Sequence, residues 1–381
     1  MTGNTMRPLS PARLFLVLWA VLALGACGGG KEEDASGGAV PLPDGTSLEA
    51  SDGEAESGEG EPEGAGPPRS IEEPAWGKIC GTDKAPRLEV SLAPEQDVIP
   101  LGELAVMEIR VKNAGEKPVR CSMVSHDILS AYLEILYENR RFQYIKIRKE
   151  YFDPIFQDAR SRPYLPAITL PPGEAESTTL RFLLPVAGTY RVRAVYRGLG
   201  PSNLLFYASP WTDVKALPDG EAEALHALVY TDMGNMEFAF HARRALATCI
   251  NFLTLVFQRF YDGNLEFHRV ERHFIIQSGD PSGTGTGGPG YYIPQEFNRL
   301  PHLEGTLSMA RASHVDTAGS QFFISLDMDA DNQRLLDGQY TVFGCVVSGF
   351  ETARKIGTVQ VDGNRKPIDP VRITKITLVK R

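Results

Sequence analysis

The sequence has few cysteines, no excess of basic residues, and no apolar run long enough to span a membrane. Its five cysteines among 381 residues include no Cys-x-x-Cys pair, so the usual zinc-ligand spacings are excluded. The formal net charge of -9 argues against a nucleic-acid-binding protein, which would present a basic surface. The apolar run Leu14–Leu24 is too short for a transmembrane helix, which needs about 20 residues.

The composition nevertheless supports a folded core. Hydrophobic residues make up 42% of the chain and charged residues 23%, and the length suits two domains with additional segments. The negative charge is concentrated in residues 28–83, which hold 14 acidic and three basic residues. Residues 84–381 contain 34 of each sign. The acidity therefore describes one segment and indicates nothing about a substrate.

The N-terminus has the pattern of a secretory signal, because two arginines precede the apolar run and small residues follow it. The sequence Leu-Gly-Ala-Cys at residues 24–27 resembles the lipobox of bacterial lipoproteins. That resemblance implies a lipoprotein signal peptide over 1–27, lipid attachment at Cys27, and an extracytoplasmic protein anchored to a bacterial membrane. Gly28 favours the outer membrane, facing the periplasm. The alternative is an ordinary signal peptide with an incidental cysteine.

Residues 28–83 are dominated by Gly, Glu, Ala, Ser and Pro, and bulky apolar residues are almost absent. No core can offset the entropy of ordering such a segment, so we expect a disordered acidic linker. A spacer between the membrane and the domains is the expected role. An acidic tail that binds a basic partner is the alternative.

Residues 84–216 show the period-two alternation of short β-strands. Apolar residues alternate at Leu88, Val90 and Leu92, at Met107, Ile109 and Val111, and at Tyr190, Val192, Ala194 and Tyr196. Turn sequences such as Leu-Pro-Pro-Gly at 170–173 separate them, which predicts a β-sandwich. This turn and the Gly188–Val192 segment resemble immunoglobulin-like modules of bacterial surface proteins. The resemblance implies a spacer or protein-binding role and no chemistry.

The remaining cysteines leave two possibilities open. Cys80 and Cys121 could form a disulfide in a secreted protein, or Cys121 could be a buried thiol. We expect Cys249 and Cys345 to be separate core thiols.

Residues 222–381 begin with two expected strands, Leu225–Tyr230 and Met236–His241, followed by an expected helix over Arg243–Arg259. Apolar residues for its core are Ala247, Ile250, Leu253, Leu255 and Phe257. The Gly283–Gly288 run lacks a following helix and is not a dinucleotide fingerprint. Asp327, Asp329 and Asp331 lack the glycine and glutamate of an EF-hand. We expect both stretches to be loops.

Five blocks in this region carry a family resemblance, and they occur in the family's order. They read FYDGNLEFHRV at 260–270, FIIQSGD at 274–280, GTLSMARA at 305–312, GSQFFI at 319–324 and LDGQYTVFG at 336–344. Together they are similar to the cyclophilin-type peptidyl-prolyl cis-trans isomerases over about 160 of the 381 residues. The resemblance implies an eight-stranded antiparallel β-barrel capped by two helices. The expected chain is thus mainly β, with an immunoglobulin-like β-sandwich followed by a cyclophilin-like barrel over 222–381.

The resemblance also implies the site residues. Arg269 matches the catalytic arginine of the family, and Gln277 matches a side chain that holds it. Residues that match the substrate-binding positions are Phe274, Ile275, Ala310, Arg311, Gln321, Phe323, Leu336 and Tyr340. Leu335 stands where cyclosporin-sensitive members carry tryptophan, so tight cyclosporin binding is not expected.

The chemistry of the implied reaction suits these residue types. Rotation about a peptide bond faces a barrier of about 18–20 kcal/mol, although cis and trans X–Pro forms differ little in energy. A catalyst needs an apolar pocket for the proline ring and fixed donors that favour the twisted amide. We therefore expect no cofactor and no metal, and proline-containing polypeptides as clients. We also expect membrane attachment through the lipid, no nucleic-acid partner, and a monomer.

Two other classes of function stay open at this point. The barrel could bind proline-rich segments as a scaffold without useful catalysis, or the protein could be a general chaperone whose isomerase activity is incidental.

Overall fold

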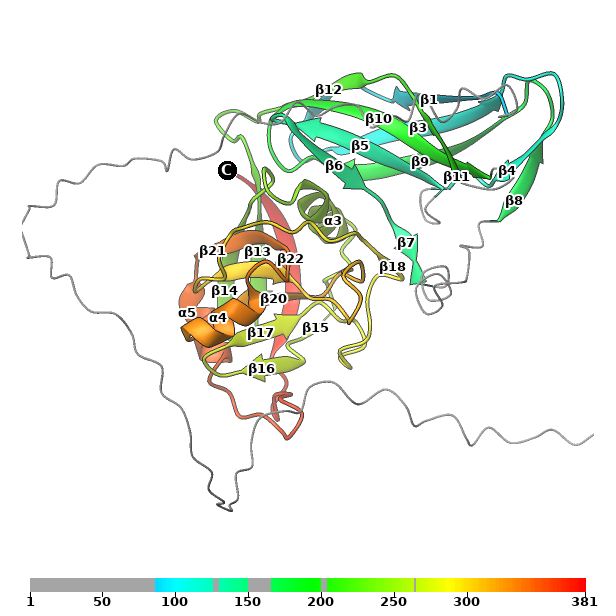
Figure 1. The fold of residues 1–381 in the computed structure, drawn as a ribbon. Helices are drawn as coiled ribbons and strands as arrows, with labels where there is room; N and C mark the ends of the chain where they lie inside the picture. The colour runs from blue at the N-terminus through cyan, green and yellow to red at the C-terminus, as the bar shows by residue number, and fades with distance from the viewer. Residues whose placement is uncertain (1–85, 126–129, 150–165, 200–203, 264) are drawn as a thin grey trace, which may run out of the picture. The chain divides into compact units, whose positions relative to one another are not determined.

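The computed structural model describes residues 86–125, 130–149, 166–199, 204–263 and 265–381, all of which fall in one compact unit, Arg69–Arg381 (Figure 1). The expected signal peptide, acidic linker, Cys27 and Cys80 lie outside these residues. The described fold is mainly β with few helices, as the sequence predicts.

The first part of the described chain contains two main sheets. One has the order β1-β3-β9 and consists of Leu88–Pro94, Leu104–Asn113 and Ala175–Leu183. The other has the order β2-β12-β10-β5-β6, with β11 also paired to β10. Its strands are Val98–Pro100, Thr212–Leu217, Gly188–Leu199, Ala131–Tyr137, Arg140–Tyr144 and, for β11, Leu204–Ala208. Short ladders join β4 (Val119–Ser122) to β8 (Ala167–Leu170), and β7 (Ile147–Arg148) to β18 (Tyr291–Tyr292).

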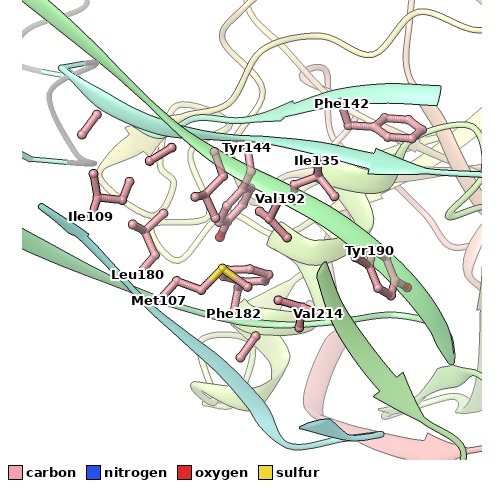
Figure 2. Close-up of a cluster of buried hydrophobic side chains, with 14 of the residues drawn as sticks. Met107, Ile109, Ile135, Phe142, Tyr144, Leu180, Phe182, Tyr190, Val192 and Val214 are labelled. Atoms are coloured by element: carbon pink, nitrogen blue, oxygen red, sulfur yellow. The ribbon is translucent and has the colours of Figure 1, made fainter. Parts of the chain in front are cut away.

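Apolar side chains from both sheets fill one core (Figure 2). Met107 and Ile109 of β3 are fully buried, as is Tyr190 of β10, so the alternation in the sequence correctly marks the inward faces. Tyr190 stacks on Tyr137 with ring centroids 4.5 Å apart. Cys121 lies in the same core as a free thiol.

The second part of the described chain is a single antiparallel sheet that closes on itself. Its order is β15-β22-β13-β14-β21-β19-β20-β17-β16. The strands are Leu265–Glu266, Arg372–Lys380, Leu225–Thr231, Gly234–Phe240, Val342–Ser348, Thr306–Met309, Phe322–Ser325, Ile275–Ser278 and Arg269–Glu271. β15 and β16 stand at opposite ends of this order, and only Phe267 and His268 separate them along the chain. They form one interrupted strand that closes the barrel, which then has the eight strands that were expected.

The expectation of two helices in this region is wrong, because the described barrel carries three. They are α3 (Leu246–Phe257), α4 (Ala330–Leu336) and α5 (Phe350–Ile356). The acidic stretch expected to be a loop instead starts α4. Its Asp329 side chain caps the helix by accepting a hydrogen bond from the amide of Asn332 at 2.8 Å, and Asp331 lies in the first turn. The Gly283–Gly288 run is a loop, as predicted.

Helix α3 is buried along almost its whole length, from Leu246 to Val256. Leu246 and Ile250 belong to the same apolar cluster as residues of the first two sheets, and Thr254 Oγ1 accepts a hydrogen bond from the Leu183 amide at 3.1 Å. Phe257, which was expected in the core, is 44% exposed because the helix ends there. The start of α3 thus belongs to the core cluster of the first two sheets, while the barrel has a core cluster of its own, and experiments on either region are best done with the full chain.

Cys249 is a buried free thiol in the barrel core, whereas Cys345 is a free thiol that is only partly buried. None of the helices in the described ranges combines the length and apolarity needed to cross a bilayer.

Candidate active site

An apolar cluster lies beside strands β17 and β20, outside the main barrel core, and we call it the pocket cluster because residues predicted to bind the proline ring meet in it. In β17 the side chains alternate, so Ile276 joins the barrel core while Ile275 joins the pocket cluster. The same alternation in β20 sends Ile324 inward and Phe323 to the pocket. The buried members of the cluster are Ile275, Ala310, Phe323 and Leu336, with Phe274, Met328 and Tyr340 packed against them.

Six residues predicted as substrate-binding therefore meet in one cluster. Tyr340 stands edge-on to Phe323 with ring centroids 5.5 Å apart. Met328 also packs against this cluster but was not predicted. It lies between Asp327 and Asp329, where no apolar periodicity or motif marks it as a site residue. The apolarity of such a cluster suits contact with a small aliphatic ring.

Arg269 is held beside this pocket by a chain of polar side chains. It faces Gln277 across the β16–β17 ladder, and its Nη1 donates to Gln277 Oε1 at 3.4 Å. Gln277 Nε2 donates to Gln321 Oε1 at 2.9 Å. Gln321 Nε2 in turn donates to the carbonyl oxygens of Gly285 and Gly287, at 3.0 and 2.9 Å. The predicted catalytic arginine and both predicted glutamines thus form one hydrogen-bonded series.

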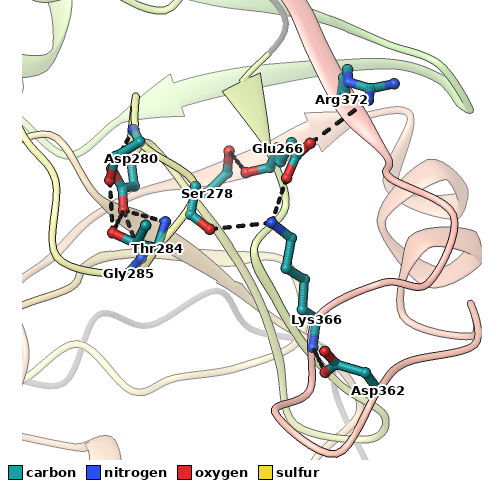
Figure 3. A network of polar contacts seen from close by, with 10 residues as sticks. Glu266, Ser278, Asp280, Thr284, Gly285, Asp362, Lys366 and Arg372 are labelled. Carbon is teal, nitrogen blue, oxygen red and sulfur yellow. Dashed lines mark hydrogen bonds and ion pairs between the residues drawn. The ribbon is translucent and has the colours of Figure 1, made fainter.

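The glycine-rich loop at the end of this series is organised by Asp280, which is nearly fully buried (Figure 3). Its Oδ2 accepts from the amides of Thr284 and Gly285, and its Oδ1 accepts from the amide and hydroxyl of Ser282. Burial acts to raise the pKa of Asp280, but these donors outweigh it and lower the pKa to about 2. The carboxylate is therefore charged under all ordinary conditions and fixes the loop.

Gly279 permits β17 and β20 to approach closely at this point. Its φ of +93° lies in the left-handed region, and a Cβ atom there would come within 2.3 Å of the Ser320 carbonyl oxygen. The neighbouring Ser278 is fully buried, and its hydroxyl donates to the Glu266 carbonyl oxygen at 2.9 Å.

Ala310 and Arg311 follow β19 at the other side of the pocket. The Ala310 amide donates to the Gln321 carbonyl oxygen at 2.9 Å. The Arg311 guanidinium lies over the Tyr340 ring, 4.8 Å from its centroid, and its Nε donates to the Gln339 carbonyl oxygen at 3.2 Å. These contacts hold the positively charged Arg311 side chain at the edge of the pocket cluster, next to Tyr340.

His302 packs against the pocket cluster. This contact was not predicted from the sequence. Its ring stacks on Phe323 with centroids 5.9 Å apart. Its Nδ1 and Nε2 contact Asp337 Oδ1 and Ser308 Oγ, both at 2.8 Å. Burial lowers the pKa of His302 even though Asp337 favours its charged form. Ser308 is fully buried, so this arrangement holds an aromatic side chain in place and offers no accessible nucleophile.

Over the described ranges, the His, Cys, Asp and Glu side chains form no group of three that could hold a metal ion. His268 is buried, and burial lowers its pKa although the nearby Asp280 carboxylate favours the charged ring.

Comparison with known proteins relates the barrel to one family. The model for the cyclophilin type peptidyl-prolyl cis-trans isomerases matches residues 226–378. A peptidyl-prolyl cis-trans isomerase of Arabidopsis thaliana is 39% identical over 171 residues, which cover 44% of this chain and 99% of the relative. One from Synechococcus elongatus is 50% identical over 118 residues, which cover 31% of this chain and 77% of the relative.

Among solved structures, a cyclophilin type isomerase of Cryptosporidium parvum is 36% identical. The similarity covers 41% of this chain and 99% of that one, with a TM-score of 0.38. The pocket and the arginine series lie within the region that the family model matches. Through this region the chain belongs to the cyclophilin-type peptidyl-prolyl cis-trans isomerase family.

Proposed function

We propose that this family member accelerates X–Pro rotation with Arg269 as its catalytic residue and the apolar cluster around Phe323 as its proline pocket. The observation that carries the proposal is the placement of the guanidinium. It is hydrogen-bonded to Gln277, whose cross-strand neighbour on the other side is Phe323. The cation donor on β16 and Phe323 of the apolar cluster on β20 therefore flank the same strand, β17.

This arrangement suits the reaction without a covalent intermediate. As the amide twists, the proline nitrogen regains its lone pair and can accept a hydrogen bond that the planar amide cannot accept. The guanidinium is permanently charged and presents its donors in a rigid plane. In this proposal the apolar cluster holds the ring while the preceding carbonyl rotates, and Gln277, Gln321, Ala310 and Arg311 bind the flanking backbone.

The direct test is turnover of a proline-containing peptide in a protease-coupled assay with the full chain. We expect Arg269→Ala to lower kcat/KM at least about tenfold, since a lost transition-state donor costs roughly 2.7–4 kcal/mol in other enzymes. Arg259→Ala is the matched control, because the Arg259 side chain is 81% exposed and forms its ion pair with Asp262. Unchanged turnover in the Arg269 variant would remove this residue from its role.

We further propose four parts for the chain: a lipoprotein signal peptide over 1–27, a disordered acidic linker over 28–83, an immunoglobulin-like domain over 84–216 and the isomerase domain over 222–381. The signal pattern, the Leu-Gly-Ala-Cys sequence and the acidic composition support this organisation. The protein would act as a monomer on extracytoplasmic clients, held by Cys27 to the outer membrane. Cys27→Ala should abolish acyl labelling and move the protein from the membrane to the soluble fraction. Labelling that persists would exclude Cys27 as the attachment site.

A further inference from the structure

Glu271 lies two residues beyond Arg269, at the end of the same strand. Residues i and i+2 of a strand share a face, so both side chains lie on one side of β16 while Val270 points into the barrel core. Glu271 Oε1 accepts from Arg269 Nε at 2.7 Å and also from Arg269 Nη2. One edge of the guanidinium is thus occupied by a carboxylate that neither the composition nor the family motif indicated.

A second arginine contacts the same carboxylate oxygen. Arg365 Nη1 donates to Glu271 Oε1 at 2.8 Å. Its backbone is also tied to β16, because its carbonyl oxygen accepts from the Val270 amide at 2.8 Å. Asp362 shapes this turn, since its side chain accepts from the amides of Asn364 and Lys366. Residues almost a hundred positions apart therefore meet at one carboxylate.

The donor geometry leaves Arg269 able to act on a substrate. A guanidinium has five N–H donors. The contacts with Glu271 use one donor on Nε and one on Nη2, and the contact with Gln277 uses one on Nη1. Two donors remain for a substrate. The two arginines and one glutamate also keep a net positive charge, so Glu271 orients Arg269 without cancelling its field.

We propose that Glu271 is the positioning residue for Arg269, with Arg365 as the second cation that keeps the group positively charged. The inference depends on the proposed catalytic role of Arg269. The Arg269 and Glu271 side chains are 33% and 18% exposed, and Arg365 is 54% exposed. Ion pairs in such surroundings contribute little to folding, so the role of Glu271 is to restrict the rotamers of Arg269.

The test measures kcat and KM for the full chain carrying Glu271→Ala or Glu271→Gln. We expect Glu271→Ala to lower kcat about fivefold or more with little change in KM or in thermal unfolding, because a misdirected catalytic group loses transition-state contacts first. Glu271→Gln retains an oxygen that can accept from Nε and should restore kcat to within about threefold of the wild type. Glu266→Ala is the matched control, because Glu266 also pairs with two cations, Lys366 and Arg372, but does not touch Arg269 (Figure 3).

A double-mutant cycle separates the two proposals. If Glu271 acts through Arg269, Glu271→Ala should cause no further loss in an Arg269→Ala background. An additive loss there would overturn the inference, as would a Glu271→Ala enzyme as fast as, or faster than, the wild type. Should Arg269→Ala alone leave turnover unchanged, the proposed catalytic role fails first. Loss in Arg269→Ala combined with wild-type turnover in Glu271→Ala would refute only the positioning role.

Discussion

Replacement of Asp280 by Asn tests whether one buried carboxylate organises the loop behind the active site. Asp280 Oδ1 accepts from the Ser282 amide and hydroxyl, each at 2.7 Å. Its Oδ2 accepts from the amides of Thr284 and Gly285, at 3.1 and 2.6 Å. Asparagine has the same shape, but one of its two polar atoms is an NH2 group that can only donate. Whichever way the amide is turned, at least one backbone N–H then faces another donor: the Ser282 amide in one orientation, or the amides of Thr284 and Gly285 in the other.

The structure allows the cost to be worked out. The donors lie on the exposed residues Ser282, Thr284 and Gly285, and their hydrogen bonds are partly buried. Each donor left without an acceptor therefore costs near the lower end of about 1–3 kcal/mol, which predicts a loss of roughly 1–2 kcal/mol in the free energy of unfolding. The pH dependence of the free energy of unfolding provides an independent test. The pKa of Asp280 is lowered to about 2, so its contribution is present above its unfolded pKa near 4 and is lost as the pH falls toward 2. The Asn variant lacks this acid-dependent loss.

The assay is urea unfolding of the full chain followed by circular dichroism at pH 7 and at pH 3, together with isomerase kinetics. KM should rise in Asp280→Asn, because Gln321 is held by the carbonyl oxygens of Gly285 and Gly287 in this loop. Ser282→Ala is the control, since it removes one hydroxyl donor and leaves the carboxylate intact, and its effect should be smaller. An Asp280→Asn protein within about 0.5 kcal/mol of the wild type at pH 7 would refute the reasoning.

Two further predictions concern the pocket. Leu336→Ala should cost about 2–5 kcal/mol of stability and lower kcat/KM, because Leu336 is 5% exposed within the apolar cluster. The adjacent Leu335 is 66% exposed, so Leu335→Ala should change neither quantity, and equal effects in the two variants would contradict the assignment of the pocket. Burial lowers the pKa of His302, so its contribution to stability is complete above pH 6.5 and is lost as the pH falls through the lower folded pKa. His302→Gln should therefore show a smaller loss of stability than the wild type between pH 7.5 and pH 5.5 in urea unfolding, and an identical loss would exclude this role.

Much of the fold could be predicted because its signals are local. Alternation at Met107 and Ile109, and at Tyr190 and Val192, marks buried strand faces directly, since side chains alternate across a strand. The errors are local as well. The stretch with Asp327, Asp329 and Asp331 was expected to be a loop. Aspartate is also a favoured N-cap residue and stabilises the first turn of a helix, and here Asp329 caps α4 while Asp331 lies in its first turn. Phe257 was placed in the core by helical spacing, although the helix ends at that residue.

The sequence by itself determined the family, because the blocks that carry the resemblance have a specific order and content. Only the tertiary structure decided which polar groups meet. Closure of the barrel through β15 and β16 brings Arg365 to Glu271, and the packing of the 302–308 segment brings His302 under Phe323. These pairs join residues about 20 to 90 positions apart, and no periodicity or local turn encodes such distances. The charge balance around Arg269 is therefore a property of the closed barrel.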